Sequence, residues 1–133
     1  KNIWYVQELA YMYFEQGNYS ESIKQFQRLV EYESRNVEWW YAYAECLAKA
    51  GKYSEAIKAL EKTEDQVGKH PELTLQKFQL YVQMKQVDKG IAEIEKARKE
   101  FPDDPQLLAT LVDYYLKNNQ QLILRQEDIL YRH

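Results

Sequence analysis

Apolar residues recur along this chain at steps of three and four residues, and polar residues fill the positions between them. Ile23, Phe26 and Val30 form one such stretch, and Leu9 and Tyr13 belong to another. These steps place side chains on one face of an α-helix, because the helix completes a turn every 3.6 residues or so, about the mean of the two steps. The pattern therefore predicts a series of short amphipathic helices.

The pattern itself repeats with a period of about 34 residues. Residues 17–24 read GNYSESIK, and residues 51–58 read GKYSEAIK, so that six of eight positions are identical. Ile91 continues the series of Ile23 and Ile57 by one more period. A fixed period of this length is typical of a solenoid, in which equal units stack on one another.

The period divides the chain into units that end near Asn36, His70 and Asp104. Pro71 and Pro105 suit the first turn of the helix that follows, where the missing amide hydrogen needs no partner. We therefore predict one domain, 1–133, built from helix pairs at 3–36, 37–70, 71–104 and 105–133.

A turn is predicted inside each unit, between its two helices. Gly17 and Gly51 suit this turn because glycine readily adopts the left-handed backbone that ends a helix. The third unit has Lys85 there, where the same backbone is more costly. Residues that could cap the second helix follow at the same spacing, namely Ser20, Ser54 and Asp88.

The order of the residues in the units identifies the kind of repeat. The second unit carries Trp40, Ala44, Leu47, Gly51, Tyr53, Ala56 and Leu60. The first unit carries Leu9, Ala10, Tyr13, Gly17, Tyr19, Ser22 and Phe26, with Val6 in place of the tryptophan. This arrangement resembles the tetratricopeptide repeat, and the chain resembles about three and a half such repeats.

The later units depart from the pattern. The third keeps Tyr81, Ile94, Ala97 and Pro102 but has Phe78 at the position of the small residue. The fourth keeps Leu108, Leu111 and Tyr115 and then diverges at Leu122, Leu124 and Asp128, so its last helix is expected to be a cap or a repeat in shifted register. The resemblance implies an all-α solenoid of antiparallel helix pairs, coiled into a right-handed superhelix.

The resemblance also implies a function: a protein-interaction module that binds a peptide or partner segment in the concave groove lined by the first helices. The residues expected on that face are Trp4, Gln7, Tyr11, Phe14, Glu38, Tyr41, Glu45, Lys49, Leu75, Gln79, Val82 and Asp113. Their aromatic and acidic side chains suit a partner with apolar and basic residues. The alternative is a structural spacer or self-association segment of a longer array, in which Trp4 and Phe14 contact a preceding repeat.

One ligand of the family is not expected here. Repeats that hold the carboxylate tail of cytosolic chaperones use Lys and Asn, then Asn, then Lys and Arg on three successive first helices. The matching positions in this chain are Gln7 and Tyr11, then Ala42, then Glu72 and Gln76. Because none of them is a cation, nothing at these positions pairs with a carboxylate.

Composition narrows the function further. Eighteen basic and 21 acidic residues give a net charge of −3, and no dense basic stripe suggests a nucleic-acid partner. The apolar runs are too short for a membrane span. No targeting segment is visible, which leaves the cytoplasm and a bacterial cell envelope open as compartments.

Neither catalysis nor a cofactor is expected. The two histidines, His70 in a turn and His133 at the end, have no evident partner for acid–base chemistry or zinc binding. Cys46 fits a buried, inert thiol. Asp103 and Asp104 fit a turn with a helix cap better than a cation site. We therefore predict no enzyme, no cofactor and no metal.

Overall fold

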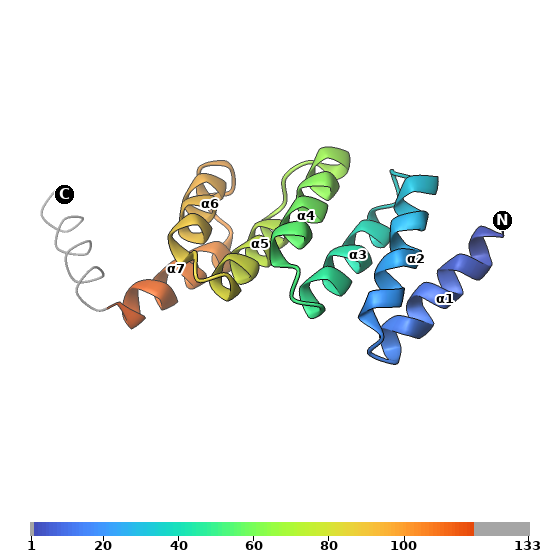
Figure 1. Cartoon of the computed structure of the whole chain (residues 1–133). Coiled ribbons are helices and arrows are strands. Elements are labelled where there is room, and N and C mark those ends of the chain that lie inside the picture. The colour runs from blue at the N-terminus through green and yellow to red at the C-terminus, as the bar shows by residue number, and fades with distance from the viewer. Residues whose placement is uncertain (1, 119–133) are drawn as a thin grey trace, which may run out of the picture.

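The computed structural model describes residues 2–118, in which seven helices stack side by side in chain order (Figure 1). They are α1 (Ile3–Glu15), α2 (Tyr19–Tyr32), α3 (Val37–Lys49), α4 (Tyr53–Val67), α5 (Pro71–Gln83), α6 (Val87–Glu100) and α7 (Pro105–Lys117). Each helix packs on the next, so α1 and α7 lie at opposite ends. The all-α prediction is confirmed for these residues, and the expected cap at the end of the fourth unit lies outside them.

The turns inside the helix pairs have the backbone that the sequence predicted. Gly17 and Gly51 have φ angles of 77° and 80°, in the left-handed region. Lys85 adopts the same conformation with φ of 60°, the one non-glycine residue with positive φ in the described chain. The turn geometry is therefore kept in the third pair, although the left-handed backbone is strained for a lysine.

The second helices begin earlier than the sequence predicted. Asn18 caps α2 with its side chain, and the equivalent Lys52 and Gln86 precede α4 and α6 without a side-chain cap. The left-handed residue turns the chain so sharply that one residue separates it from the new helix. The prediction of caps is therefore wrong for three residues that lie inside the first turn: Ser20, Ser54 and Asp88.

Small residues allow the two helices of a pair to cross closely. The Ser22 hydroxyl is fully buried and donates a hydrogen bond to the carbonyl oxygen of Ala10 at 2.7 Å. In the second pair Ala44 and Ala56 belong to one buried cluster. These positions recur once in each unit, and their predicted role in close packing is confirmed. A larger side chain there would separate the backbones.

The replacement Ala56→Leu is expected to destabilise the protein by about 1–3 kcal/mol or more, since Ala56 is fully buried in the α3–α4 crossing. Thermal unfolding followed by circular dichroism measures the effect. Ala92→Leu on the exposed face of α6 is the matched control, expected to melt with the parent. An Ala56→Leu protein that also melts with the parent would contradict the assignment of this column to the crossing.

In the third pair, a large residue replaces one of the two small residues at the crossing. Phe78 stands where Ala10 and Ala44 stand in the earlier units, and it faces Gly90 on α6. A Cβ atom at Gly90 would lie only 2.8 Å from Cδ1 of Phe78. The glycine therefore makes room for the ring, so a large residue is accommodated at this crossing.

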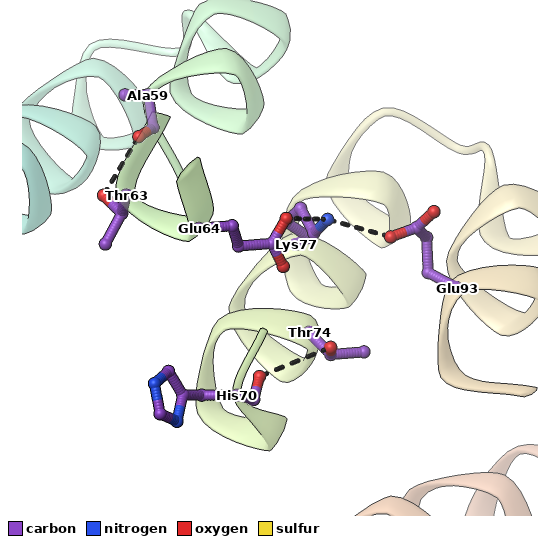
Figure 2. Close-up of polar contacts among 7 residues, drawn as sticks. All are labelled: Ala59, Thr63, Glu64, His70, Thr74, Lys77 and Glu93. Carbon is purple, nitrogen blue, oxygen red and sulfur yellow. Dashed lines mark hydrogen bonds and ion pairs between the residues drawn. The ribbon is translucent and has the colours of Figure 1, made fainter. Parts of the chain in front are cut away.

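A buried ion cluster joins the second and third pairs (Figure 2). Lys77 of α5 is 3% exposed, and its ammonium lies 3.0 Å from Oε1 of Glu64 on α4 and 2.9 Å from Oε1 of Glu93 on α6. Burial alone would lower the pKa of Lys77, but its hydrogen bonds to the two carboxylates outweigh burial and raise that pKa. The cluster therefore holds three successive helices together through one charged side chain.

Candidate binding groove

A groove of about 630 Å³ opens between α1, α3 and α5. Its lining consists of Tyr11 from α1, Glu38, Tyr41, Ala42, Ala44, Glu45 and Ala48 from α3, Leu60 from α4, and Gln76, Gln79 and Leu80 from α5. This volume lies within the range of about 300–1,000 Å³ that is common for ligand sites. The first helices of three successive units thus contribute to one hollow.

Helix α3 provides most of the lining because the groove follows one of its faces. Glu38, Tyr41, Ala42, Glu45 and Ala48 follow one another at steps of three, one, three and three residues, which keeps them on neighbouring turns of one side. The alanines leave space between the larger side chains. The groove therefore exists because α3 has small residues where α1 and α5 have longer ones.

A smaller hollow of about 210 Å³ continues the groove toward the C-terminal end of α3. It shares four lining residues with the groove and adds Lys49, Tyr53 and Gln83. The shared residues are Glu45, Ala48, Gln79 and Leu80. The two hollows together form a continuous channel that could hold an extended segment or a helix.

Carboxylates give the groove a negative potential. Burial raises the pKa of Tyr11, and the charge of nearby Glu38 raises it further. Burial likewise raises the pKa of Tyr41, with a second contribution from the charge of Glu72. Within residues 2–118, the ion pairs involve other carboxylates, so Glu38, Glu45 and Glu72 have no ion-pair partner in this part of the chain.

The structure brings half of the sequence-predicted site residues together. Tyr11, Glu38, Tyr41, Glu45 and Gln79 line the groove, and Lys49 lines the adjoining hollow. Tyr11 is held by an edge-on contact with Phe26, with ring centroids 5.0 Å apart. Residues from three successive units of the repeat thus contribute to one surface.

Three other predicted residues are engaged in packing. The side-chain carbonyl of Gln7 accepts a hydrogen bond from the Trp39 indole at 2.9 Å. Phe14 contacts the Tyr19 ring at a centroid distance of 5.7 Å and packs on the buried cluster that includes Phe26 of α2. Leu75 packs on the cluster between α5, α6 and α7. These side chains position the helices and do not line the groove.

The last three predicted residues are exposed outside the groove lining. Trp4 and Val82 are exposed on α1 and α5. Asp113 on α7 pairs with Lys117 at 3.3 Å. Since the groove is formed by the first three units, the contribution expected from the fourth unit is missing from its lining.

Sequence reasoning missed the small residues that create the space. Ala42 and Ala48 line the groove, and so does Gln76, which follows Ala42 by one period of the repeat. The period contains the signal that could have revealed Ala42, because the equivalent positions in the other units hold Glu8, Gln76 and Thr110. A small residue in a column of long polar ones indicates a local hollow.

Three residues that the sequence analysis considered for chemistry lie outside the groove lining, namely Cys46, His70 and Asp104. Burial raises the pKa of the Cys46 thiol to about 11, although a hydrogen bond with Ser22 at 3.2 Å acts in the opposite direction. His70 precedes α5, as predicted, and its Nε2 lies 3.1 Å from the carbonyl oxygen of Val67. Asp104 caps α7 through the Leu107 amide at 3.0 Å, as predicted.

Two further observations concern the described part of the chain. Residues 2–118 contain no group of His, Cys, Asp or Glu side chains arranged to hold a metal ion. No helix among them is long and apolar enough to cross a membrane.

Comparison with known families gives two overlapping matches. Two sequence profiles, both described as tetratricopeptide repeat, match residues 8–71 and residues 47–114. Together they include all the residues that line the groove. Among curated protein sequences, none is similar enough to this chain to count as a relative.

Several solved structures share the fold. The type III secretion chaperone SycD of Yersinia enterocolitica, bound to a peptide of the translocator YopD, is 19% identical with a TM-score of 0.66, over 87% of this chain and 90% of that chain. The second TPR domain of human RPAP3, bound to the HSP70 peptide SGPTIEEVD, is 17% identical with a TM-score of 0.65, over 81% and 90%. The TPR domain of P58(IPK) is 19% identical with a TM-score of 0.71, over 92% of this chain and 36% of that chain.

Proposed function

Because this chain belongs to the tetratricopeptide repeat family, we propose that it binds a segment of another protein in the groove between α1, α3 and α5. One observation carries the proposal: a groove of about 630 Å³ on the first helices is lined by three alanines, two tyrosines and two glutamates, among others. Grooves of this kind bind a few anchor side chains strongly, and surrounding contacts exclude water. Peptide complexes of SycD and RPAP3 support the same general use of the fold. The proposed role is non-catalytic.

The partner segment is proposed to combine an apolar anchor with basic residues. Ala42, Ala44 and Ala48 leave room for an aliphatic or aromatic side chain against Leu60 and Leu80. Glu38 and Glu45 lie seven residues apart on α3, or roughly 10 Å along the helix axis. Two carboxylates at this spacing, neither in an ion pair within residues 2–118, suit Lys or Arg on both sides of the anchor, because complementary potentials favour encounter and orientation.

The charge of the groove does not suit the peptide that is bound in the RPAP3 complex. The peptide in that complex, SGPTIEEVD, is acidic. An acidic peptide would meet Glu38 and Glu45 at this groove, and like charges in contact are costly. The proposed ligand therefore has the opposite sign of charge.

Fluorescently labelled peptides test this preference directly. We expect a short peptide of alternating Leu and Lys to bind, while its counterpart with Glu in place of Lys and the peptide SGPTIEEVD do not. Glu45→Lys is expected to weaken binding of the Lys peptide by at least about tenfold, and Lys58→Glu on the exposed face of α4 should leave it unchanged. Equal binding of the Lys and Glu peptides would contradict the proposed charge preference.

Changes in the groove itself test the location. Tyr41→Ala removes an aromatic anchor, and Ala42→Trp fills the hollow at a position whose counterparts hold long side chains. Each is expected to reduce the affinity for peptides selected from a phage-displayed library on the parent protein by at least about tenfold. Isothermal titration calorimetry measures the affinity, and thermal unfolding confirms that each variant is folded.

The alternative function, a spacer or self-association segment, predicts the reverse outcome. In that case the groove variants would bind the selected peptides as the parent does. Removing the residues from 105 onward would instead abolish the association of this chain with its partner protein. Such a result would replace the groove with the ends of the solenoid as the interaction site.

A further inference from the structure

Two tyrosines line the groove, and the packing of the helices uses only part of each ring. Tyr11 of α1 is 37% exposed and contacts Phe26 edge-on, with ring centroids 5.0 Å apart. Tyr41 of α3 is half-buried and packs at the margin of the buried cluster that includes Leu60. Both side chains border the same hollow. Each ring therefore keeps part of its surface for a bound side chain.

Carboxylates accompany both rings. Glu38 precedes Tyr41 by three residues and Glu45 follows it by four, so both lie beside Tyr41 on one side of α3. The charge of Glu38 also contributes to the raised pKa of Tyr11, which places this carboxylate near the ring on α1 as well. Within residues 2–118, Glu38 takes part in no ion pair. The groove thus combines two aromatic rings with a carboxylate that both helices share.

A positive charge for this carboxylate has to come from the partner segment. Among residues 2–118, no lysine or arginine lines the main hollow. Lys49 lines only the smaller hollow, where it stands one turn after Glu45 and opposes the charge of that residue. The place for a bound cation is therefore at the other end of the groove, near Glu38.

We propose that this cation is the guanidinium group of an arginine, held against the rings of Tyr11 and Tyr41 and paired with Glu38. The proposal rests on the proposed function and adds to it the identity of the basic side chain. A guanidinium is planar, stacks on aromatic rings and donates two parallel hydrogen bonds to one carboxylate, so it uses both kinds of group at once. A lysine ammonium is a compact and strongly hydrated charge without a plane to stack, so it gains less here.

A methylated lysine fits the same groups less well. Its cationic head is attracted to aromatic faces and is typically enclosed by a cage of them. The lining of the main hollow contains two aromatic residues, and the carboxylate of Glu38 lies beside them. A trimethylated ammonium has no N–H to donate to that carboxylate, whereas a guanidinium has five.

Four fluorescently labelled peptides test which side chain is preferred. They alternate leucine with arginine, lysine, trimethyllysine or citrulline, and fluorescence anisotropy measures their affinities for the protein. The arginine peptide is expected to bind at least about fivefold more tightly than the lysine peptide, and the trimethyllysine peptide no more tightly than the lysine peptide. The citrulline peptide should bind at least about tenfold more weakly than the arginine peptide, because citrulline keeps the planar shape but has no charge.

Variants of the tyrosines test where the arginine lies. Tyr11→Leu and Tyr41→Leu each remove an aromatic face and are expected to lower the ratio of arginine to lysine affinity at least about twofold, whereas Tyr11→Phe and Tyr41→Phe should keep that ratio. The ratio is the readout because a general loss of structure would weaken the binding of both peptides alike. The control Tyr32→Leu, at a side chain that is 67% exposed on α2 outside the groove lining, should change neither affinity.

The outcomes separate this proposal from the proposed function. Equal affinities for the arginine and lysine peptides, both weakened by Ala42→Trp, would overturn the arginine preference and leave the groove as the binding site. An arginine preference that survives both leucine variants would overturn the role of the two rings. Tighter binding of the trimethyllysine peptide than of the arginine peptide would replace the proposal with recognition of methylated lysine. If none of the four peptides binds, the proposed function and the arginine preference fail together.

Discussion

Replacing Phe78 with alanine is expected to lower the free energy of unfolding by about 3–5 kcal/mol. The ring is buried in the cluster that joins α5, α6 and α7, so its removal leaves a cavity in the core. Chemical denaturation measures the change. The size of the effect alone would not distinguish Phe78 from other large core residues, so the sharper test concerns Gly90.

The effect of Gly90→Ala is expected to change sign with the residue at position 78. In the parent, the added Cβ would meet the Phe78 ring at 2.8 Å, and overpacking of this kind costs about 1–3 kcal/mol. In the Phe78→Ala background the ring contact is gone and the nearest remaining atom is Cβ of Tyr81 at 3.2 Å, so alanine should stabilise α6 by up to about 1 kcal/mol because it forms helix better than glycine. Gly90→Ala effects of the same sign in both backgrounds would contradict the conclusion that Gly90 makes room for the Phe78 ring.

Much of the fold could be predicted from the sequence because residues with the same packing role recur at equivalent positions of several units. Gly17 and Gly51 predicted the left-handed turns, and Ala10, Ser22 and Ala56 predicted the close crossings. The helix starts could not be placed as well. A residue such as Ser20 can cap a helix or occupy its first turn, and the choice depends on how sharply the preceding turn reverses the chain.

The site was less predictable than the fold. The period places Tyr11, Glu45 and Gln79 in one column, and they do line the groove. It could not show that Gln7 is held by Trp39 or that Leu75 packs on the next unit, because these contacts depend on side chains of neighbouring units. Column membership therefore fixes the face of a helix, but local side-chain sizes decide where that face is hollow.

The buried ion cluster shows what a departure from the period can mean. Lys77 stands in the column of Leu9, Tyr43 and Leu111, where an apolar residue is the rule. Its partners also replace uncharged residues of the preceding unit, since Glu64 stands one period after Val30 and Glu93 one period after Ala59. A lysine in an apolar column predicts nearby carboxylates, since a buried ammonium is stable only when it is paired.

Replacing Lys77 with alanine is expected to lower the free energy of unfolding by about 3–5 kcal/mol, because the change leaves Glu64 and Glu93 close together without their cation. The exposed pair of Lys24 and Glu21, 3.1 Å apart, provides the matched control. Lys24→Ala should cost less than about 1 kcal/mol. Chemical denaturation of both variants measures the difference between a buried and an exposed lysine.

The triple variant Lys77→Leu, Glu64→Val, Glu93→Ala takes its residues from the other units. It should be at least as stable as the parent, since apolar replacements of whole buried ion clusters are neutral or favourable by about 1–4 kcal/mol.

The pH dependence of stability tests whether Lys77 and Glu93 form the ion pair in solution. Burial raises the pKa of Glu93, but the hydrogen bond and charge of Lys77 outweigh burial and lower that pKa below its ordinary 4.5. A lowered carboxyl pKa contributes stability that is present above pH 4.5 and lost as the pH falls through the folded-state value. Between neutral pH and a pH of about 3, the parent should therefore lose more stability than the triple variant. Equal losses would show that Lys77 and Glu93 do not form the ion pair in solution.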